Sequence, residues 1–305
     1  MENYLLAMSV FAGLYALMAL GLNVVFGLGG LINLGLAGFY AIGGYVSALL
    51  VLKAGWPMLA GWVAASLACA AAGVVLALIT ARLKGDYLAI VTLGFAEVIR
   101  LIASNELWLT NGTDGISNIP GPGRGVLSPL QFNLLYAAIV WTLVLVVALL
   151  LGRLSASPFG RVLRAIREDE MIAAVAGKPV LRFKVQAFAV GSAVMGLAGA
   201  LYAHFNAYVA PDAFQALVTI YVVLALIAGG TGRMAGAVLG SVLVVFLTEG
   251  TRFAGGWVPG LSPVQVAALR EASIGIALIL VLYVRPQGIL PERTRVLSVT
   301  SAPAR

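Results

Sequence analysis

Two oppositely charged residues, Glu97 and Arg100, lie three positions apart in the apolar run 87–104, which is long enough to cross a bilayer. Residues at this spacing share one face of a helix, so we expect the two side chains to pair. Because charge at membrane depth is costly, such a pair is a functional hypothesis in itself. Glu97 could titrate or bind a cation in an ion-driven transporter, or the pair could lock neighbouring helices together.

Four other polar residues lie in apolar runs: Asn23, Asn33, Thr92 and the single histidine, His204. The first three could line a path across the membrane, although hydrogen bonding between helices is the favoured interpretation. His204 is expected near the outer end of a span, and its place in such a path is a hypothesis. The predicted path residues are Asn23, Asn33, Thr92, Glu97, Arg100 and His204.

The most densely charged segment, SPFGRVLRAIREDEMIAAVAGKPVLRFK at 157–184, lies between two long apolar runs. Ser157 is suited to cap a helix, and Pro158 to occupy its first position. Gly177 followed by Pro179 predicts where that helix stops. We therefore expect one helix, spanning residues 158–176.

Within this helix, Arg164 and Glu168 lie four residues apart and could pair on one face. A charged, capped helix in the middle of a membrane protein indicates a docking element for a soluble partner. The alternative is a solvated loop that is basic only because it lies on the cytoplasmic side of the membrane.

The residue patterns that support catalysis are missing. The nucleotide-binding pattern G-x-x-x-x-G-K-[ST] does not occur, because Gly177-Lys178 lacks the upstream glycine and is followed by Pro179. Clusters of His, Cys and carboxylates with metal-ligand spacing, and nucleophiles beside a base, do not stand out either. The single Cys69 excludes a disulfide framework within the chain. We expect no catalytic site, no cofactor and no metal, and therefore a protein that is not itself an enzyme.

Composition predicts the elements that position these residues. Hydrophobic residues make up 61% of the 305 residues and charged residues 10%, whereas a soluble domain carries about 25% charged residues. This excludes a soluble protein and predicts an all-α, polytopic bundle of transmembrane helices in a single domain, 1–305. The net charge of +7 does not indicate nucleic-acid binding, because the basic residues gather at membrane boundaries.

About nine spans are expected, within a range of roughly 8–10. They cover residues 4–26, 34–52, 58–81, 87–104, 131–151, 185–207, 217–229, 234–250 and 267–284. The loop 152–184 and the tail after Tyr283 are rich in Lys and Arg, which predicts that both are cytoplasmic. The loop 105–130 has Arg124 as its one basic residue and is expected outside, and counting back places the N-terminus outside as well.

Small residues recur every four positions in two of these runs. They are Gly232, Gly236 and Gly240 in one, and Ser192, Gly196 and Ala200 in the other. Such faces let helix backbones approach closely, which is the simpler interpretation. The sharper interpretation is that the glycine-rich clusters at 21–45 and 228–241 form broken helices beside a substrate path.

Three longer segments appear in a characteristic order. They read GDYLAIVTLGFAEVIRL at 85–101, LTNGTDGISNIPGP at 109–122, and FGRVLRAIREDEMIAAVAGKPVLRFKVQAFAVGSAVMGLAGALYA at 159–203. With them, the chain resembles the membrane permease subunits of bacterial ABC importers for branched-chain amino acids. The third segment is the most specific of the three.

This resemblance implies that the loop 157–184 contains a coupling helix that docks into a groove of an ATPase subunit. The matching residues are Arg161, Arg164, Arg167, Glu168, Asp169, Glu170, Ala174 and Gly177. Their charges could pair with the partner, while a small apolar face is expected from Ile166, Ile172, Ala173 and Ala176. The resemblance also implies two ABC ATPase subunits, a second and homologous permease, a periplasmic substrate-binding protein that meets the loop 105–130, and a location in the bacterial inner membrane.

The chain departs from the family's usual pattern at residues 30–45. Relatives often read GQLSLGHAAFFGIGAY there, whereas this chain reads GLINLGLAGFYAIGGY, with Asn33 in place of Ser and Leu36 in place of His. The departure leaves the solute open, because related permeases carry urea, amides and aromatic acids. Two other classes also stay open: an ion-coupled secondary transporter that uses Glu97, and a membrane scaffold that transports nothing.

Overall fold

The structure is a computed structural model that describes residues 2–254 and, after them, residues 265, 268, 272, 275–276, 279–280, 283–285 and 287–292. Seven of the described helical segments are long and apolar enough to cross a membrane, which confirms the prediction of an all-α, polytopic protein. They are α1 (Glu2–Leu22) continued by the π-helix η1 (Asn23–Leu28), α2 (Leu36–Lys53), α3 (Met58–Ile79), α4 (Gly85–Asn105), α6 (Pro129–Ala156), α9 (Val180–Asn206), and the 3-10 helix η3 (Pro211–Phe214) with α10 (Ala216–Gly229).

An eighth helix, α11 (Met234–Ala254), follows α10 and has a shorter apolar part, Met234–Glu249. These eight segments correspond to eight of the expected spans. The ninth, at 267–284, lies mostly outside the described residues.

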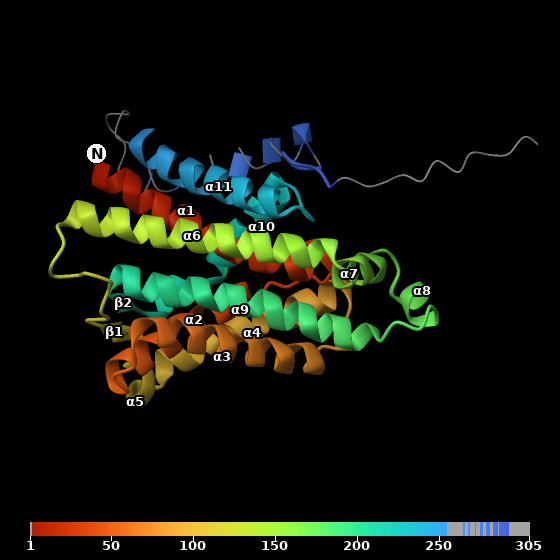
Figure 1. The fold of residues 1–305 in the computed structure, drawn as a ribbon, viewed down its shortest axis with the longest axis horizontal. Coiled ribbons are helices and arrows are strands. Elements are labelled where there is room, and N and C mark those ends of the chain that lie inside the picture. Colours follow the sequence, from red (N-terminus) through yellow and green to blue (C-terminus); the bar gives the residue numbers. More distant parts are fainter. Residues whose placement is uncertain are drawn as a thin grey trace, which may run out of the picture.

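The long helices run side by side along the longest axis of the molecule (Figure 1). One end carries the short helices α7 (Pro158–Glu168) and α8 (Glu170–Val175). The other end carries α5 (Leu107–Thr110), the 3-10 helix η2 (Gly112–Asp114), and the antiparallel strands β1 (Ile116–Ser117) and β2 (Tyr208–Val209). The N-terminus also lies at this second end, so the two loops lie at opposite ends, as their charges predict.

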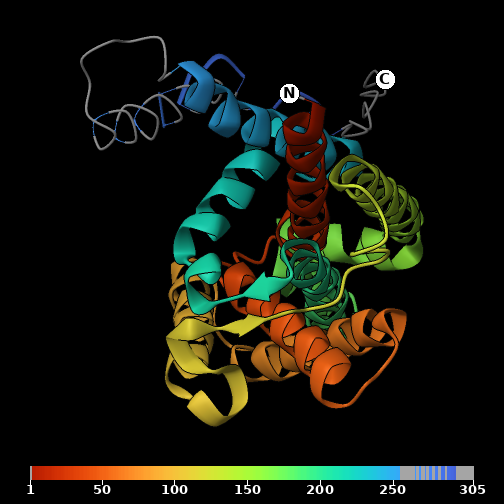
Figure 2. The ribbon, with the colours of Figure 1, turned by 90° about the vertical axis from the view of Figure 1, so that its left-hand side faces the viewer.

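Helix α9 lies centrally and packs against α1, α2 and α3 (Figure 2). Its contact with α2 joins backbone to backbone, because a Cβ on Gly43 would overlap the carbonyl of Gly196, and a Cβ on Gly199 would overlap the backbone of α2. A Cβ on Gly73 of α3 would likewise overlap the hydroxyl of Ser192. The small-residue face predicted for this helix is therefore a close-packing surface.

Helices α10 and α11 also pack through glycine. A Cβ on Gly240 would overlap the carbonyl of Ala225, and a Cβ on Gly229 would overlap that of Gly236. The four-residue repeat predicted that Gly232 would continue this face. It does not, because Gly232 lies in the turn before α11 with φ +83°. This left-handed backbone conformation cannot be part of an α-helix.

The first glycine-rich cluster interrupts the chain between α1 and α2, where it turns at Gly30 with φ +66°. The start of α2 is held by hydroxyl groups of other helices. The N–H of Leu34 donates to Oγ1 of Thr92 (3.0 Å), and the N–H of Ala37 donates to Oγ1 of Thr219 (3.1 Å). The predicted break is therefore present, and side chains from α4 and α10 satisfy N–H groups that a helix start leaves free.

Candidate functional site

The charged segment predicted to dock a soluble partner, called the α7–α8 element below, consists of two short helices rather than the single helix expected over 158–176. Helix α7 ends at Glu168 because Asp169 is extended, with φ −154° and ψ 112°. The Asp169 carboxylate then caps α8 by accepting hydrogen bonds from the N–H groups of Met171 (2.8 Å) and Ile172 (3.0 Å). Aspartate favours a helix cap over a helix interior, so this residue divides the segment.

The predicted ends of the element are partly confirmed. Pro158 occupies the first turn of α7, and Gly177, at φ +76°, follows the end of α8. Ser157 precedes α7 but does not cap it, because its hydroxyl donates to the carbonyl of Leu154 (2.6 Å). The pairing of Arg164 with Glu168 is wrong too, because Arg164 donates to the hydroxyl and the carbonyl of Ser155.

Arg167 faces its own subunit. One of its terminal nitrogens donates to the carbonyl of Gly27 in η1. The other pairs with Glu292 at 2.8 Å and with Glu168 at 3.4 Å. One guanidinium thus joins α7 to the end of the first span and to a residue near the C-terminus.

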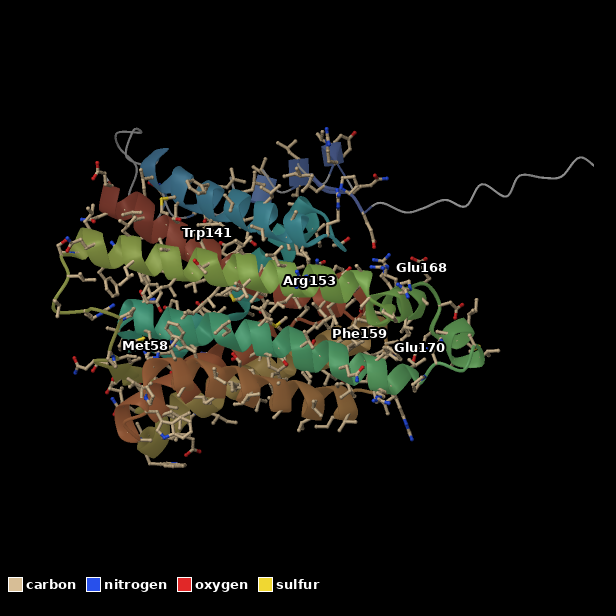
Figure 3. The ribbon with its side chains drawn as sticks, viewed as in Figure 1. Met58, Trp141, Arg153, Phe159, Glu168 and Glu170 are labelled. Carbon is tan, nitrogen blue, oxygen red and sulfur yellow. The ribbon has the colours of Figure 1, made fainter. Side chains whose placement is uncertain are left out.

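Glu170, which opens α8, is likewise bound within the subunit. Its carboxylate pairs with Lys84, just before α4, at 3.0 Å and with Lys184 of α9 at 2.8 Å. Burial raises the pKa of this carboxyl, but the hydrogen bonds from Lys184 and Lys84 outweigh it and bring the pKa below the ordinary value of 4.5. Figure 3 places Glu170 and Glu168 at the α7–α8 end of the bundle.

Replacing Glu170 with Gln should destabilise this end of the protein by about 1 kcal/mol, because two lysines lose the negative charge that they share. Glu168→Gln is the matched control, since Glu168 is exposed and has one long contact. The contribution from Glu170 is complete above about pH 4.5 and disappears as the pH falls through its lowered pKa. Thermal unfolding across pH 3–7 checks this, and equal losses in both variants would contradict it.

Other residues of the element face outward. Arg161, Glu168, Asp169, Ala174 and Gly177 are exposed, as expected for docking residues. The apolar face differs from the prediction: Ile166 and Ala173 are buried in the subunit, whereas Ile172 is exposed. Within these two helices, the most exposed apolar side chains are those of Met171 (72%) and Val175 (85%). A concave groove of about 560 Å³ runs between α7 and α8.

The polar residues of the spans are placed in hydrogen bonds between elements. Asn23 accepts from the N–H of Gly232 (2.8 Å) and contacts the sulfur of Met234 (3.4 Å). Thr92 accepts from Leu34 and donates to the carbonyl of Ala89 (3.0 Å). These contacts fit the favoured interpretation of hydrogen bonding between helices.

Asn33 and His204 are both buried. Asn33 accepts from the N–H of Gly35 (2.8 Å), while its side-chain nitrogen has no hydrogen-bond partner among the described residues. His204 lies between the hydroxyl of Ser47 (2.8 Å) and the carbonyl of Pro120 (2.6 Å). The histidine therefore joins α9 to α2 and to the external loop, and its role in a path stays a prediction.

Glu97 and Arg100 form the predicted ion pair, with two bonds from the guanidinium Nε of 3.0 and 3.1 Å. The Glu97 side chain is 46% exposed, on a helix whose neighbouring apolar side chains, Val98 and Leu101, are exposed as well. The pair thus lies on an outer face of α4 at membrane depth, where hydrocarbon would penalise it. Another protein surface or water is needed to cover it.

Several ionic partners of the α7–α8 element were not predicted from the sequence. They are Lys84, Lys184 and Glu292, which lie outside this element in the sequence. Lys184 carries one signal that could have found it, because it is a charged residue directly before the apolar run 185–207. The others look like ordinary boundary charges.

Comparison with known proteins identifies the family. Residues 4–282 match the model of the family described as branched-chain amino acid transport system / permease component. The chain is 34% identical over 317 residues to the high-affinity branched-chain amino acid transport system permease protein LivM of Salmonella typhimurium, covering 96% of this chain and 71% of that protein. It is 33% identical to the LivM protein of Escherichia coli, covering 91% and 68%.

An archaeal protein is similar as well. The probable branched-chain amino acid transport permease protein LivM of Methanocaldococcus jannaschii is 31% identical over 231 residues, covering 72% of this chain and 64% of that protein. No solved structure gives a significant match. The apolar helices and these relatives make this chain a multi-pass membrane protein. It belongs to the family of permease components of branched-chain amino acid transport systems.

Proposed function

We propose that this chain is a permease subunit of an ABC importer that moves branched-chain or similar hydrophobic amino acids across the inner membrane. In this proposal ATP hydrolysis takes place in two separate ATPase subunits, and a second, homologous permease of the LivH type completes the pore. A periplasmic binding protein delivers the solute. The observation that carries the proposal is the outward apolar surface of α8 at the basic, cytoplasmic end of the bundle.

The α7–α8 element has the features of a protein-docking surface. Met171, Ile172 and Val175 project apolar side chains from α8, and an isolated soluble end would not keep three such residues exposed together. Arg161, Glu168 and Asp169 surround the groove beside them. An apolar centre with a charged rim is the usual arrangement of an interface, so an ATPase subunit fits here.

The outer face of α4 supports a partner within the membrane. The Glu97–Arg100 pair is exposed there, beside Gly94, which has open space around it as far as the described part of the chain goes. A second permease facing α4 would shelter the pair and would place it at the boundary between the two subunits. This arrangement fits a path lined at that boundary by Glu97 and Arg100.

The external loop 105–130 forms a firm surface at the opposite end. Strand β1 pairs with β2 after α9, and the N–H of Ile119 donates to the carbonyl of Ala207 (3.1 Å). Arg124 stacks on the ring of Phe132 at 4.6 Å and donates to the carbonyl of Phe205. A loop held in this way can receive a binding protein without first paying a large ordering entropy.

The test is uptake of radiolabelled L-leucine by proteoliposomes that contain this chain, a homologous permease, the ATPase subunits and the binding protein. Uptake should require ATP and binding protein, and it should be unchanged by ionophores that collapse proton and sodium gradients. Uptake of urea or amides in place of leucine would change the solute and leave the importer class intact.

The ion-driven alternative makes the opposite prediction. It needs Glu97 free to titrate or to bind a cation, whereas Arg100 binds both oxygens of that carboxylate. Uptake without ATP that collapses with the ion gradient and disappears in Glu97→Gln would establish that alternative. Intact association of all subunits with no flux of any solute would indicate a scaffold.

A further inference from the structure

A cavity of about 240 Å³ opens at the cytoplasmic end of the subunit, separate from the groove between α7 and α8. Four segments that are distant in sequence form its walls: the connection between α1 and α2, the turn before α4, the docking helices, and the start of α9. Its volume lies below the range of about 300 Å³ and upward that is usual for drug-sized ligands. The cavity therefore suits a small solute.

Charged side chains line part of the cavity. Lys84 and Lys184 are both among them, and among the described residues Glu170 is the ionic partner of each. An ammonium group has three N–H donors, so each lysine keeps donors beyond the one used by Glu170. Arg167 lines the same cavity. Three cationic groups and one carboxylate thus line one small space.

Apolar side chains complete the lining of the cavity. Leu31, Leu88 and Ile166 line the cavity and are almost fully buried, and Leu83 beside them is half-buried. The space therefore offers cations, an anion and an aliphatic surface together. An amino acid with an aliphatic side chain carries the complementary groups: a carboxylate, an ammonium group and a branched hydrocarbon.

We propose that this cavity binds a free hydrophobic α-amino acid from the cytoplasmic side. The carboxylate bridges Lys84 and Lys184, the ammonium group binds Glu170, and the side chain contacts Leu31 and Leu88. The choice of amino acid rests on the proposed function, whereas the charge pattern of the cavity does not. This site is distinct from the path across the membrane, because it binds amino acid that has already been transported into the cytoplasm.

Occupancy of this site bears on transport. The cavity wall includes Gly30, at the turn between the first two spans, and Arg167 and Glu170 on the docking helices. A solute bound among them favours the arrangement in which these segments lie together, as in this structure. Accumulated amino acid therefore slows further uptake by resisting the movement of α7 and α8 against the spans.

The experiment is calorimetric titration of the purified transporter in lipid nanodiscs, without ATP or binding protein. The probes are L-leucine, L-leucinamide, which lacks the carboxylate, and 4-methylpentanoate, which lacks the ammonium group. Leucine should bind in the millimolar range, and loss of either charged group should weaken binding by about tenfold or more. Equal binding of all three probes would overturn the assignment.

Variants locate the site. Lys184→Met should abolish the titration, while Lys178→Met, at an exposed lysine outside the cavity, should leave it unchanged. Because Lys184→Met also removes a partner of Glu170, Leu83→Trp provides a second variant, which fills the cavity and leaves its charges in place. Leucine binding that survives Leu83→Trp would place the ligand elsewhere and refute the proposal.

Transport assays separate this proposal from the proposed function. Leucine trapped inside proteoliposomes should slow ATP-driven uptake several-fold, and Leu83→Trp should remove that effect. Normal uptake with no titratable leucine site would refute binding in the cavity and leave the proposed importer function intact. Titratable leucine that leaves uptake unaffected from inside would refute the link to transport.

Discussion

Placing aspartate at both Met171 and Val175 is expected to abolish ATP-driven uptake while the protein still inserts and folds. These side chains are 72% and 85% exposed and lie four residues apart on α8, so neither substitution creates a buried charge in the subunit. In an interface with the ATPase, each would place an unpaired carboxylate in an apolar contact. A loss of about 2 kcal/mol at one such position already weakens association by roughly thirtyfold.

The measurement is the amount of ATPase that co-purifies with a tagged permease, followed by uptake in proteoliposomes. The matched control is Leu107→Asp with Val126→Asp, since these residues are comparably exposed, at 72% and 89%, in the external loop. ATPase association should survive in the control. Unchanged association in the Met171 and Val175 variant would remove the docking role of α8.

Replacing Gly43 with alanine is expected to cause a large loss of folding stability, although it adds a single methyl group. The new Cβ would overlap the backbone of Gly196, and two packed helices cannot separate locally to admit it. Inserting one carbon into a tight contact costs about 1–3 kcal/mol. The α2–α9 contact should loosen, and the melting temperature and the yield of monodisperse protein should fall.

Gly94→Ala is the matched control within another span. A Cβ at Gly94 would meet none of the residues that the structure describes, and alanine in a helix is favoured over glycine by up to about 1 kcal/mol. The isolated subunit should therefore keep or improve its stability with this change, measured by thermal unfolding in detergent. Equal losses for Gly43→Ala and Gly94→Ala would show that the close contact with Gly196 does not determine the result.

The sequence predicts the spans well because the bilayer sets a length and a composition that a single chain must satisfy. Runs such as 58–81 and 185–207 correspond to α3 and α9 with small shifts at their ends. The glycine faces are readable for a related reason, since close approach between helices demands small residues at fixed spacing. Gly232 shows the limit, because four-residue spacing alone cannot tell a helix position from a turn.

The position of the α7–α8 element could be predicted from the sequence, but its division into two helices could not. The charge and the proline at its start mark its position, whereas the division at Asp169 depends on one side chain that caps a second helix. The ionic partners within the subunit could not be predicted, because Glu170 and Lys84 are distant in the sequence and only the fold brings them together. For the same reason, the sequence could not show that Ile166 faces the subunit.

The π-helix η1 at the end of the first span contains one more residue than an α-helix would need for the same turn. A π-turn advances the chain by five residues per hydrogen-bonded loop, where an α-helix advances by four. Deleting one residue from Asn23–Leu28 would let the segment close as an ordinary α-helix, because a π-turn absorbs one added residue while the rest of the chain keeps its direction. Closing the turn would move the carbonyl of Gly27 relative to Arg167, so the chain length of this segment is itself under constraint.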